Sequence, residues 1–460
     1  MKKSKTYQFL LFFNEKELKN LTNFIHSTYF NKENQVKLLF DYYLANINKN
    51  PNKADAYQYI YKDNKNVLNR LNYLNTQLLA LFKDFISIEN FIEKKSIYNI
   101  SVLNKLGKIN QKHWYRLEEN KIENNRKKIS KRTSVDFQKN YLFELERINF
   151  YAEQQRTETK YLENIHHNLD AYYFIEKLKA TCTEINQQKL YNTESKQSFF
   201  KPLIQYIEQS KLHLEIPLLN IYFSAYKMLV ENSIDYFRKL KISIEVSDIE
   251  TSEIKDAFTL GLNFCIQQIN SGKTSFNNEM FEMYQTGIEK EILLINGKLS
   301  SINYSNVVTI GLRLKRFDEV ESFIEKNKSL LSGTEKQSYY SFNLAKVLFE
   351  KGKFQEVTAL YNEKLIKEIL LNIQMRILQI KAFYELGELD VCESLILSTD
   401  QLLNRKGILA YHKKVFKAFI KFSKSLVALN HFDKEMVLNL KSKIEKSDAL
   451  IEKAWLVSKL

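Results

Sequence analysis

The chain has 460 residues, a formal net charge of +15, and only 3 Pro and 10 Gly. So few helix-breaking residues predict a nearly all-α protein, and this length exceeds the ~250–300 residues at which single cores stop growing. No stretch approaches the ~20 apolar residues of a membrane span, and the 3 widely spaced cysteines are typical of buried reduced thiols. We therefore expect an elongated, cytoplasmic, all-α protein without a membrane span.

The first 95 residues predict a small helical domain. Asn14, with Glu17 three positions later, is typical of a capping box at a helix start. The apolar run Phe9 to Phe13 is too short for the core of a signal peptide, so we assign it to a helix or strand of the core. Helices are expected at about 14–26, 32–47, 54–61 and 65–90.

The order of these helices is similar to a helix-turn-helix, whose last helix enters the DNA major groove. The long helix carries Arg, Asn and Gln, the residue types that read base edges. A tight Gly turn before it and a hairpin wing after it are both missing. The alternative is that the domain simply caps the hydrophobic face of the next helices. The candidate DNA-reading residues are Asn69, Arg70, Asn72, Tyr73 and Gln77.

Residues 96–135 predict a basic helical connector. Between Lys94 and Arg132, nine Lys and three Arg stand against three Glu, which gives this segment +9 of the net charge. Basic and aromatic residues at 112–116, including Trp114 and Tyr115, would bind phosphates and stack on bases, whereas a solvated helix face explains the same run. Both interpretations stay open. The candidate phosphate-binding residues are Arg126, Lys127, Lys128, Lys131 and Arg132.

Residues 136–460 predict an array of helical pairs. Pro202 and Pro217 suit first turns of helices, and Gly272 suits a helix end. The clearest pattern covers about 301–400, where three similar turn segments recur. The apolar residues just after these turns are 37 and then 35 residues apart, close to the 34-residue period of a tetratricopeptide repeat. These residues are Phe317, Phe354 and Leu389.

The three segments resemble degenerate tetratricopeptide repeats. Gly352 and Gly387 occupy the turn position in two of them, and Lys315 replaces glycine in the first. The position of the small residue in the second helix is taken by Val320, Val357 and Cys392. The resemblance implies a TPR-like helical-hairpin solenoid behind the small N-terminal domain.

More broadly, the chain resembles an uncharacterised family of helical bacterial proteins in which a small N-terminal domain precedes such an array. The likeness implies a fold and no activity. It is carried by STYFNKE (27–33), LNFCIQQINSG (262–272), EMFEMY (279–284) and LLINGKLS (293–300).

The concave face of the first helices in the repeats is the candidate binding site. Aligning the turns places Lys346 and Lys381 at one position in successive repeats, where they would clamp carboxylates of an extended peptide. Ordinary exposed polar residues would give the same pattern. We call the following set the strip: Asn306, Thr309, Tyr339, Asn343, Lys346, Gln374, Lys381 and Tyr384.

No motif for catalysis, nucleotide binding or metal binding occurs in the sequence. His166 and His167 are adjacent, so on a helix they point about 100° apart and do not converge on one metal ion. The sequence therefore predicts a non-catalytic adaptor without cofactor or metal, which binds a protein or peptide partner in its groove. The positive net charge favours an acidic partner. The alternative is a nucleic-acid-binding regulator that uses the N-terminal helices and the connector, with the repeats as sensor or dimerisation arm.

Overall fold

The structure is a computed structural model that describes residues 4–47, 49, 51–62, 68–129, 132–152, 159–191, 200–331, 333, 336–360, 366–404, 410–447 and 449–460. Within these residues the chain is almost wholly α-helical, with one short two-stranded sheet, which confirms the all-α prediction. None of the helices described is long and apolar enough to cross a membrane. The chain forms two compact units, Met1–Ser130 with Val135–Asp170, and Lys131–Ser134 with Ala171–Leu460. Their division does not follow the predicted boundaries at 95 and 135.

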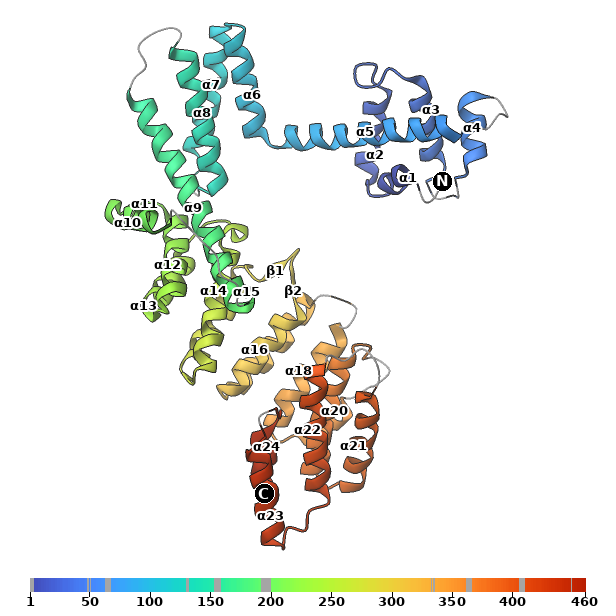
Figure 1. Ribbon diagram of the computed structural model, residues 1–460, viewed down its shortest axis with the longest axis vertical. Helices are drawn as coiled ribbons and strands as arrows, with labels where there is room; N and C mark the ends of the chain where they lie inside the picture. The colour runs from blue at the N-terminus through green and yellow to red at the C-terminus, as the bar shows by residue number, and fades with distance from the viewer. Residues whose placement is uncertain are drawn as a thin grey trace. The chain divides into compact units, whose positions relative to one another are not determined.

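Helices α1 to α5 lie together at the start of the first unit (Figure 1), and their buried side chains form one hydrophobic core. The predicted capping box opens α2: the Glu17 N–H donates to Asn14 Oδ1 at 3.0 Å, and the Asn14 N–H donates to the Glu17 carboxylate at 2.8 Å. Of the run Phe9 to Phe13, the first two residues end α1 and the other three follow it. The run is therefore partly helical, and the two-stranded sheet lies elsewhere in the described chain. The helices are α1 (Lys5–Leu10), α2 (Glu15–His26), α3 (Asn34–Ala45), α4 (Lys53–Tyr61) and α5 (Leu68–Glu93).

The predicted connector is part of a packed helical group with its own core. Tyr115 is fully buried and stacks on Phe150, with ring centroids 3.6 Å apart. Tyr115 is therefore a core residue, and the structure removes it from the aromatic residues available to stack on bases. The helices are α6 (Lys95–Lys108), α7 (Lys112–Lys127) and α8 (Ser134–Ala152), and α9 (Thr159–Tyr191) follows them.

The second unit continues with six helices and a hairpin in the described residues. Pro217 is the first residue of α12, and Gly272 follows α14 with φ 91°, both as predicted. Asn296 and Gly297 join the strands with φ 51° and 69°, the positive values that a tight hairpin turn needs. The elements are α10 (Phe200–Ser210), α11 (Leu212–Glu215), α12 (Pro217–Glu231), α13 (Ile234–Val246), α14 (Thr251–Asn270), α15 (Phe276–Glu289), β1 (Leu294–Ile295) and β2 (Lys298–Leu299).

Three helical pairs follow, and their turns have one geometry. Lys315, Gly352 and Gly387 have φ of 57°, 75° and 77°. The N–H of each of these residues donates to the carbonyl of the residue three positions earlier. The N–H of the residue that follows donates to the carbonyl five positions before it. This pair of bonds is a Schellman motif. The predicted turn positions are therefore confirmed. The pairs are α16 (Ser301–Arg313) with α17 (Phe317–Asn327), α18 (Lys336–Glu350) with α19 (Phe354–Ala359), and α20 (Ile369–Glu385) with α21 (Leu389–Leu403).

The first helices of these pairs are neighbours, since α16 packs on α18 and α18 packs on α20. The second helices begin at the predicted apolar residues, and the position expected for a small residue is fully buried in all three. A short 3-10 helix, η1 (Lys328–Leu330), follows α17. The chain then ends with α22 (Ala410–Val427), α23 (Lys434–Glu445) and α24 (Lys453–Ser458).

The cysteines are buried and unpaired, as predicted. Burial raises the pKa of Cys182 and Cys265 to about 12 and that of Cys392 to about 11. Since the thiolate is the reactive form, these thiols are inert at neutral pH.

Candidate partner-binding strip

Two asparagines of the strip tie successive helices together. Asn306 of α16 donates from Nδ2 to Tyr284 Oη of α15 at 2.9 Å. Asn343 of α18 donates from Nδ2 to Ser305 Oγ of α16 at 3.0 Å and to the Tyr339 carbonyl at 2.8 Å. Asn343 is fully buried, and its Oδ1 has no hydrogen-bond partner in the described chain. The amide groups predicted for a ligand are therefore largely used between helices, except for one buried acceptor.

Lys346 lies one turn beyond Asn343 on α18. Its Nζ donates to Thr309 Oγ1 of α16 at 2.6 Å, and Thr309 in turn donates to the Ser305 carbonyl at 2.7 Å. Among the described residues, no carboxylate lies within ion-pair distance of this ammonium group. Lys346 is half-buried as a whole, and its charged end is the enclosed part.

Desolvation is the main reason that the pKa of Lys346 falls to about 8. Glu452 and Glu350 oppose this decrease, whereas the cations of Arg313 and Lys381 add to it. Besides the bond to Thr309, the Lys346 ammonium group has a cation–π contact with Phe342, whose ring centroid lies 5.6 Å from Nζ. Its charge therefore lacks an ion pair among the described residues, and Nζ has further hydrogen-bonding capacity.

Lys381 is the equivalent residue of α20, and its charge is compensated. Its Nζ lies 2.6 Å from Glu452 Oε2, 4.2 Å from the ring centroid of Phe349 and 5.7 Å from that of Trp455. An ion pair and two cation–π contacts therefore surround this ammonium group. The two lysines that the sequence aligns differ in environment, because a carboxylate reaches only the second at ion-pair distance among the described residues.

The C-terminal segment supplies this carboxylate. Trp455 Nε1 donates to Glu385 Oε1 at 2.7 Å, and Lys459 Nζ pairs with the same oxygen at 2.5 Å. The Trp455 ring also meets Tyr384, another strip residue, edge to face at 5.6 Å. Sequence reasoning missed Glu452 and Trp455, because nothing in the periodicity of the helices connects them with a residue about 70 positions earlier.

The other strip residues lie at its margins. Tyr339 donates from its hydroxyl to Glu368 at 2.7 Å, whereas Gln374 is exposed. The structure thus brings Thr309, Lys346 and Lys381 into one electrostatic neighbourhood, and Gln374 stays outside it.

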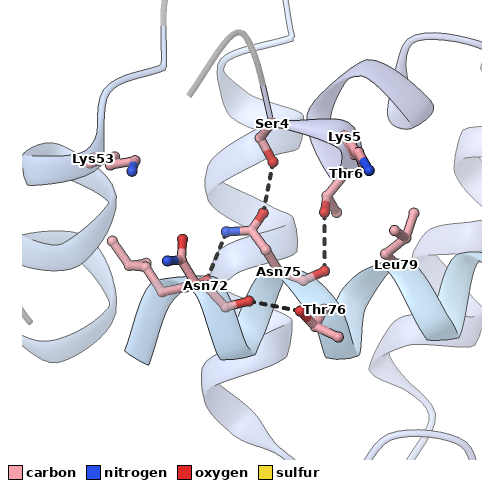
Figure 2. Close-up of a pocket in the computed structure, with 9 residues that line it drawn as sticks. Ser4, Lys5, Thr6, Lys53, Asn72, Asn75, Thr76 and Leu79 are labelled. Atoms are coloured by element: carbon pink, nitrogen blue, oxygen red, sulfur yellow. Dashed lines mark hydrogen bonds between the residues drawn. The ribbon is translucent and has the colours of Figure 1, made fainter. Parts of the chain in front are cut away.

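The candidate DNA-reading residues lie near the start of α5. Asn69, Arg70, Asn72 and Tyr73 are exposed, and Gln77 is half-buried and donates to the Tyr73 hydroxyl. Beside Asn72 lies an open cleft of ≈ 430 Å³, in which none of the described lining residues is acidic (Figure 2). It is lined by Ser4, Lys5, Thr6, Lys53, Leu71, Asn72, Asn75, Thr76 and Leu79.

Hydroxyl groups of this cleft already donate hydrogen bonds inside the domain. Ser4 and Thr6 donate to the side chain and the backbone carbonyl of Asn75, and Thr76 donates to the Asn72 carbonyl. Figure 2 shows the bonds that join Ser4 and Thr6 to Asn75 of α5, and the bond between Thr76 and Asn72 within α5. The two lysines, at the starts of α1 and α4, are thus the positive groups of the cleft.

The basic run of the connector divides into internal and exposed residues. Arg126 Nη1 lies 2.8 Å from Glu144 and 3.3 Å from Glu123, and its guanidinium carbon lies 4.9 Å from the ring centroid of Phe143. Because Glu144 is almost fully buried, Arg126 neutralises an internal carboxylate, and the structure removes it from the phosphate-binding set. Lys127, Lys128 and Arg132 are exposed, and Lys131 lies outside the described residues.

Within the described parts of the chain, no group of three or more His, Cys, Asp or Glu side chains is arranged to hold a metal ion. No protein-family model matches the chain, no curated protein gives a significant match, and no solved structure does either. The resemblance to tetratricopeptide repeats therefore stays a prediction.

Proposed function

We propose that the protein is a non-catalytic scaffold that binds a protein or peptide partner along the strip, with α16 to α21 stacked as a TPR-like solenoid. The observation that supports this most is the enclosed ammonium group of Lys346 without an ion-paired carboxylate in the described chain. An enclosed charge lowers stability unless an opposite charge or hydrogen bonds compensate it. A carboxylate of a partner would compensate the Lys346 charge. Residues that lower the stability of the folded protein are typical of functional positions.

Asn343 adds a second group to the same place. Its unpartnered Oδ1 accepts hydrogen bonds, and Lys346 on the next turn donates them. A carboxylate of a peptide segment would pair with the lysine, whereas the fully buried Asn343 would be reached by a peptide N–H only if α16 and α18 separate locally. The net charge of +15 further favours acidic partners by long-range attraction.

The test replaces Lys346 by Met, which keeps an unbranched apolar stem and removes the charge. Partners are captured from a cell lysate on the immobilised full-length protein and compared by mass spectrometry. Lys351→Met is the matched control. Lys351 comes directly after the last residue of α18, and its charge is already paired with Asp318 and Glu321. We expect the wild type and the control to capture the same partners and Lys346→Met to lose them. If Lys346→Met retains them all, the strip is not the binding site.

Lys381 is unsuitable for this first test. Its replacement would remove the ion pair with Glu452 and leave a buried site without its charge, so a loss of binding would have two explanations. The charge is therefore removed at Lys346 alone.

Nucleic-acid binding by the N-terminal domain is the second candidate, and the cleft beside the exposed face of α5 favours it. Lys5 and Lys53 would hold phosphates while Asn72 faces the bases. If so, Lys5→Gln with Lys53→Gln lowers the slope of log affinity against log salt by about 0.9 per lost phosphate contact on B-DNA. Gel retardation across a salt series measures this slope. A full-length wild type that retards no double- or single-stranded probe at low salt would exclude this function.

A further inference from the structure

The last helix of the chain, α24, lies at one end of the strip, where Leu456 is buried in the C-terminal core and Trp455 and Val457 pack against that core. It has six residues, which is too short for a helix to be stable by itself in water. Only Leu456 within it is fully buried. Glu452, which precedes it, has φ 52°, a left-handed conformation that costs free energy in residues other than glycine. The position of α24 therefore depends on its side-chain contacts.

Two of these contacts form a clamp on α20, and Lys459 Nζ pairs in addition with Glu385 of that helix. Lys381 and Glu385 are one helical turn apart and present a cation and an anion. They meet the Glu452 carboxylate and the Trp455 indole N–H, which are three positions apart in the C-terminal segment. Charges and hydrogen-bond donors are thus complementary at both points.

The clamp leaves Lys346 unpaired, although Glu452 is close enough to influence its pKa. A ligand that repeats the contacts of the segment and adds a carboxylate at Lys346 would make one ion pair more than the segment does. Such a ligand displaces the segment once the ratio of its concentration to its Kd for the free site exceeds the ratio of bound to released segment.

We propose that residues 449–460 are a displaceable internal occupant of the strip, and that the external partner is a helical peptide with a carboxylate and, three residues later, an indole ring. This inference rests on the proposed function and names the partner's chemistry and the regulation of the same site. The apparent affinity for the partner equals the affinity of the free site multiplied by the fraction of time for which the segment is released.

The experiment uses the full-length chain with Glu452→Gln and Trp455→Ala, which together remove both points of the clamp from the segment. The probe is a fluorescein-labelled synthetic peptide with the sequence of residues 447–460, and its binding is followed by fluorescence anisotropy. We expect this release variant to bind the peptide about tenfold or more tightly than the wild type does. A control peptide carrying the same two substitutions is expected to bind neither protein. A folded release variant that does not bind the wild-type peptide overturns the proposal.

The competing explanation is that α24 is a permanent cap of the C-terminal core, since Leu456 belongs to that core and other apolar side chains of the segment pack against it. These are Leu450, Ile451, Trp455, Val457 and Leu460. In that case the release variant loses its fold, which circular dichroism detects. Hydrogen exchange of the wild type then decides. We expect the amides of α24 to exchange about a hundredfold faster than those of the central turns of α20, because a displaceable segment opens locally. Equal protection of the two helices overturns the proposal.

The outcomes for the two proposals are separable. Lys346 makes no hydrogen bond or ion pair with the described C-terminal segment, so partner capture by Lys346→Met tests the proposed function alone. Peptide binding by the release variant tests the displaceable segment alone.

Discussion

At the scale of single residues, the environment of Lys346 leads to a measurable effect on stability. The pKa of Lys346 is lowered to about 8 from its ordinary value of 10.5, so the charged form is the disfavoured one in the folded protein. We predict that Lys346→Met increases the free energy of unfolding at pH 7 by about 2 kcal/mol, less than the full pKa difference implies because the residue is partly exposed. Urea denaturation at pH 7 measures the difference.

The same residue predicts the direction of a pH effect. Between pH 8 and 10.5 the unfolded chain retains the Lys346 proton while the folded chain has lost it, so this residue contributes increasing stability as the pH rises. The advantage of Lys346→Met over the wild type therefore shrinks through this window. The raised pKa values of buried cysteines and tyrosines act on both proteins and cancel in the difference. An advantage that stays constant from pH 7 to 10 would show that Lys346 is not desolvated.

Gly311 permits the close contact between α16 and α17. A Cβ atom at this position would lie 2.2 Å from Val320 Cγ2 and 2.9 Å from the Phe281 ring. We predict that Gly311→Ala lowers the free energy of unfolding by about 2–3 kcal/mol because the core is overpacked. Adding Val320→Ala removes the closest clash, so the double variant should be more stable than the sum of the two single effects indicates. Strict additivity in urea denaturation would contradict this packing.

At the scale of elements, the three Schellman turns give a matched comparison. Lys315 has φ 57° where the other two turns have glycine, and nothing lies within 4 Å of a Cβ placed on Gly352. The φ angle alone therefore determines the effect of substitution. We predict that Lys315→Gly stabilises the protein by about 0.5–1 kcal/mol and that Gly352→Ala destabilises it by about 1 kcal/mol. Thermal unfolding of the two variants measures both effects, and a destabilised Lys315→Gly would show that the lysine side chain makes a compensating contact.

The elements predicted correctly are those that local chemistry determines. The capping box at Asn14 and the turns at Gly352 and Gly387 depend on hydrogen bonds within a few residues, which a sequence displays directly. The Asn296-Gly297 hairpin was missed although its signal was local, because a predominantly helical pattern surrounds it.

The roles of side chains in the strip were less predictable. Repeat alignment placed Asn343 and Lys346 in the concave groove, whereas in the structure both side chains donate hydrogen bonds to the neighbouring helix α16. The sequence could not show that α16 itself would take up most of their hydrogen bonds. Nor could it connect Lys381 with Glu452, since pairs distant in sequence depend on how helices stack and not on their periodicity.

At the scale of the whole molecule, the positive charge is concentrated between Lys94 and Arg132, yet only part of it is available to a partner. Arg126 is held by Glu144, which is 1% exposed, whereas Lys127, Lys128 and Arg132 are exposed. Deleting this segment would remove two helices of a packed core, so a deletion cannot separate charge from folding.

Substitution can separate them. We predict that Arg126→Gln lowers the free energy of unfolding by about 2–3 kcal/mol, because Glu144 then keeps only its bond to Arg147, at 3.2 Å, as a charged partner among the described residues. The triple variant Lys127→Gln, Lys128→Gln, Arg132→Gln should unfold at the same urea concentration as the wild type, since exposed charges contribute little to stability.

The triple variant also distinguishes the two functions. A scaffold that binds through the strip should capture its partners unchanged, because none of the three substitutions touches α16, α18 or α20. A nucleic-acid binder should instead lose up to three phosphate contacts and about 0.9 in salt slope for each. We expect unchanged partner capture, measured beside gel retardation on the same preparations. Loss of all captured partners by a triple variant with wild-type unfolding would place the functional surface on the connector, because its fold would be intact and only its exposed charge would have changed.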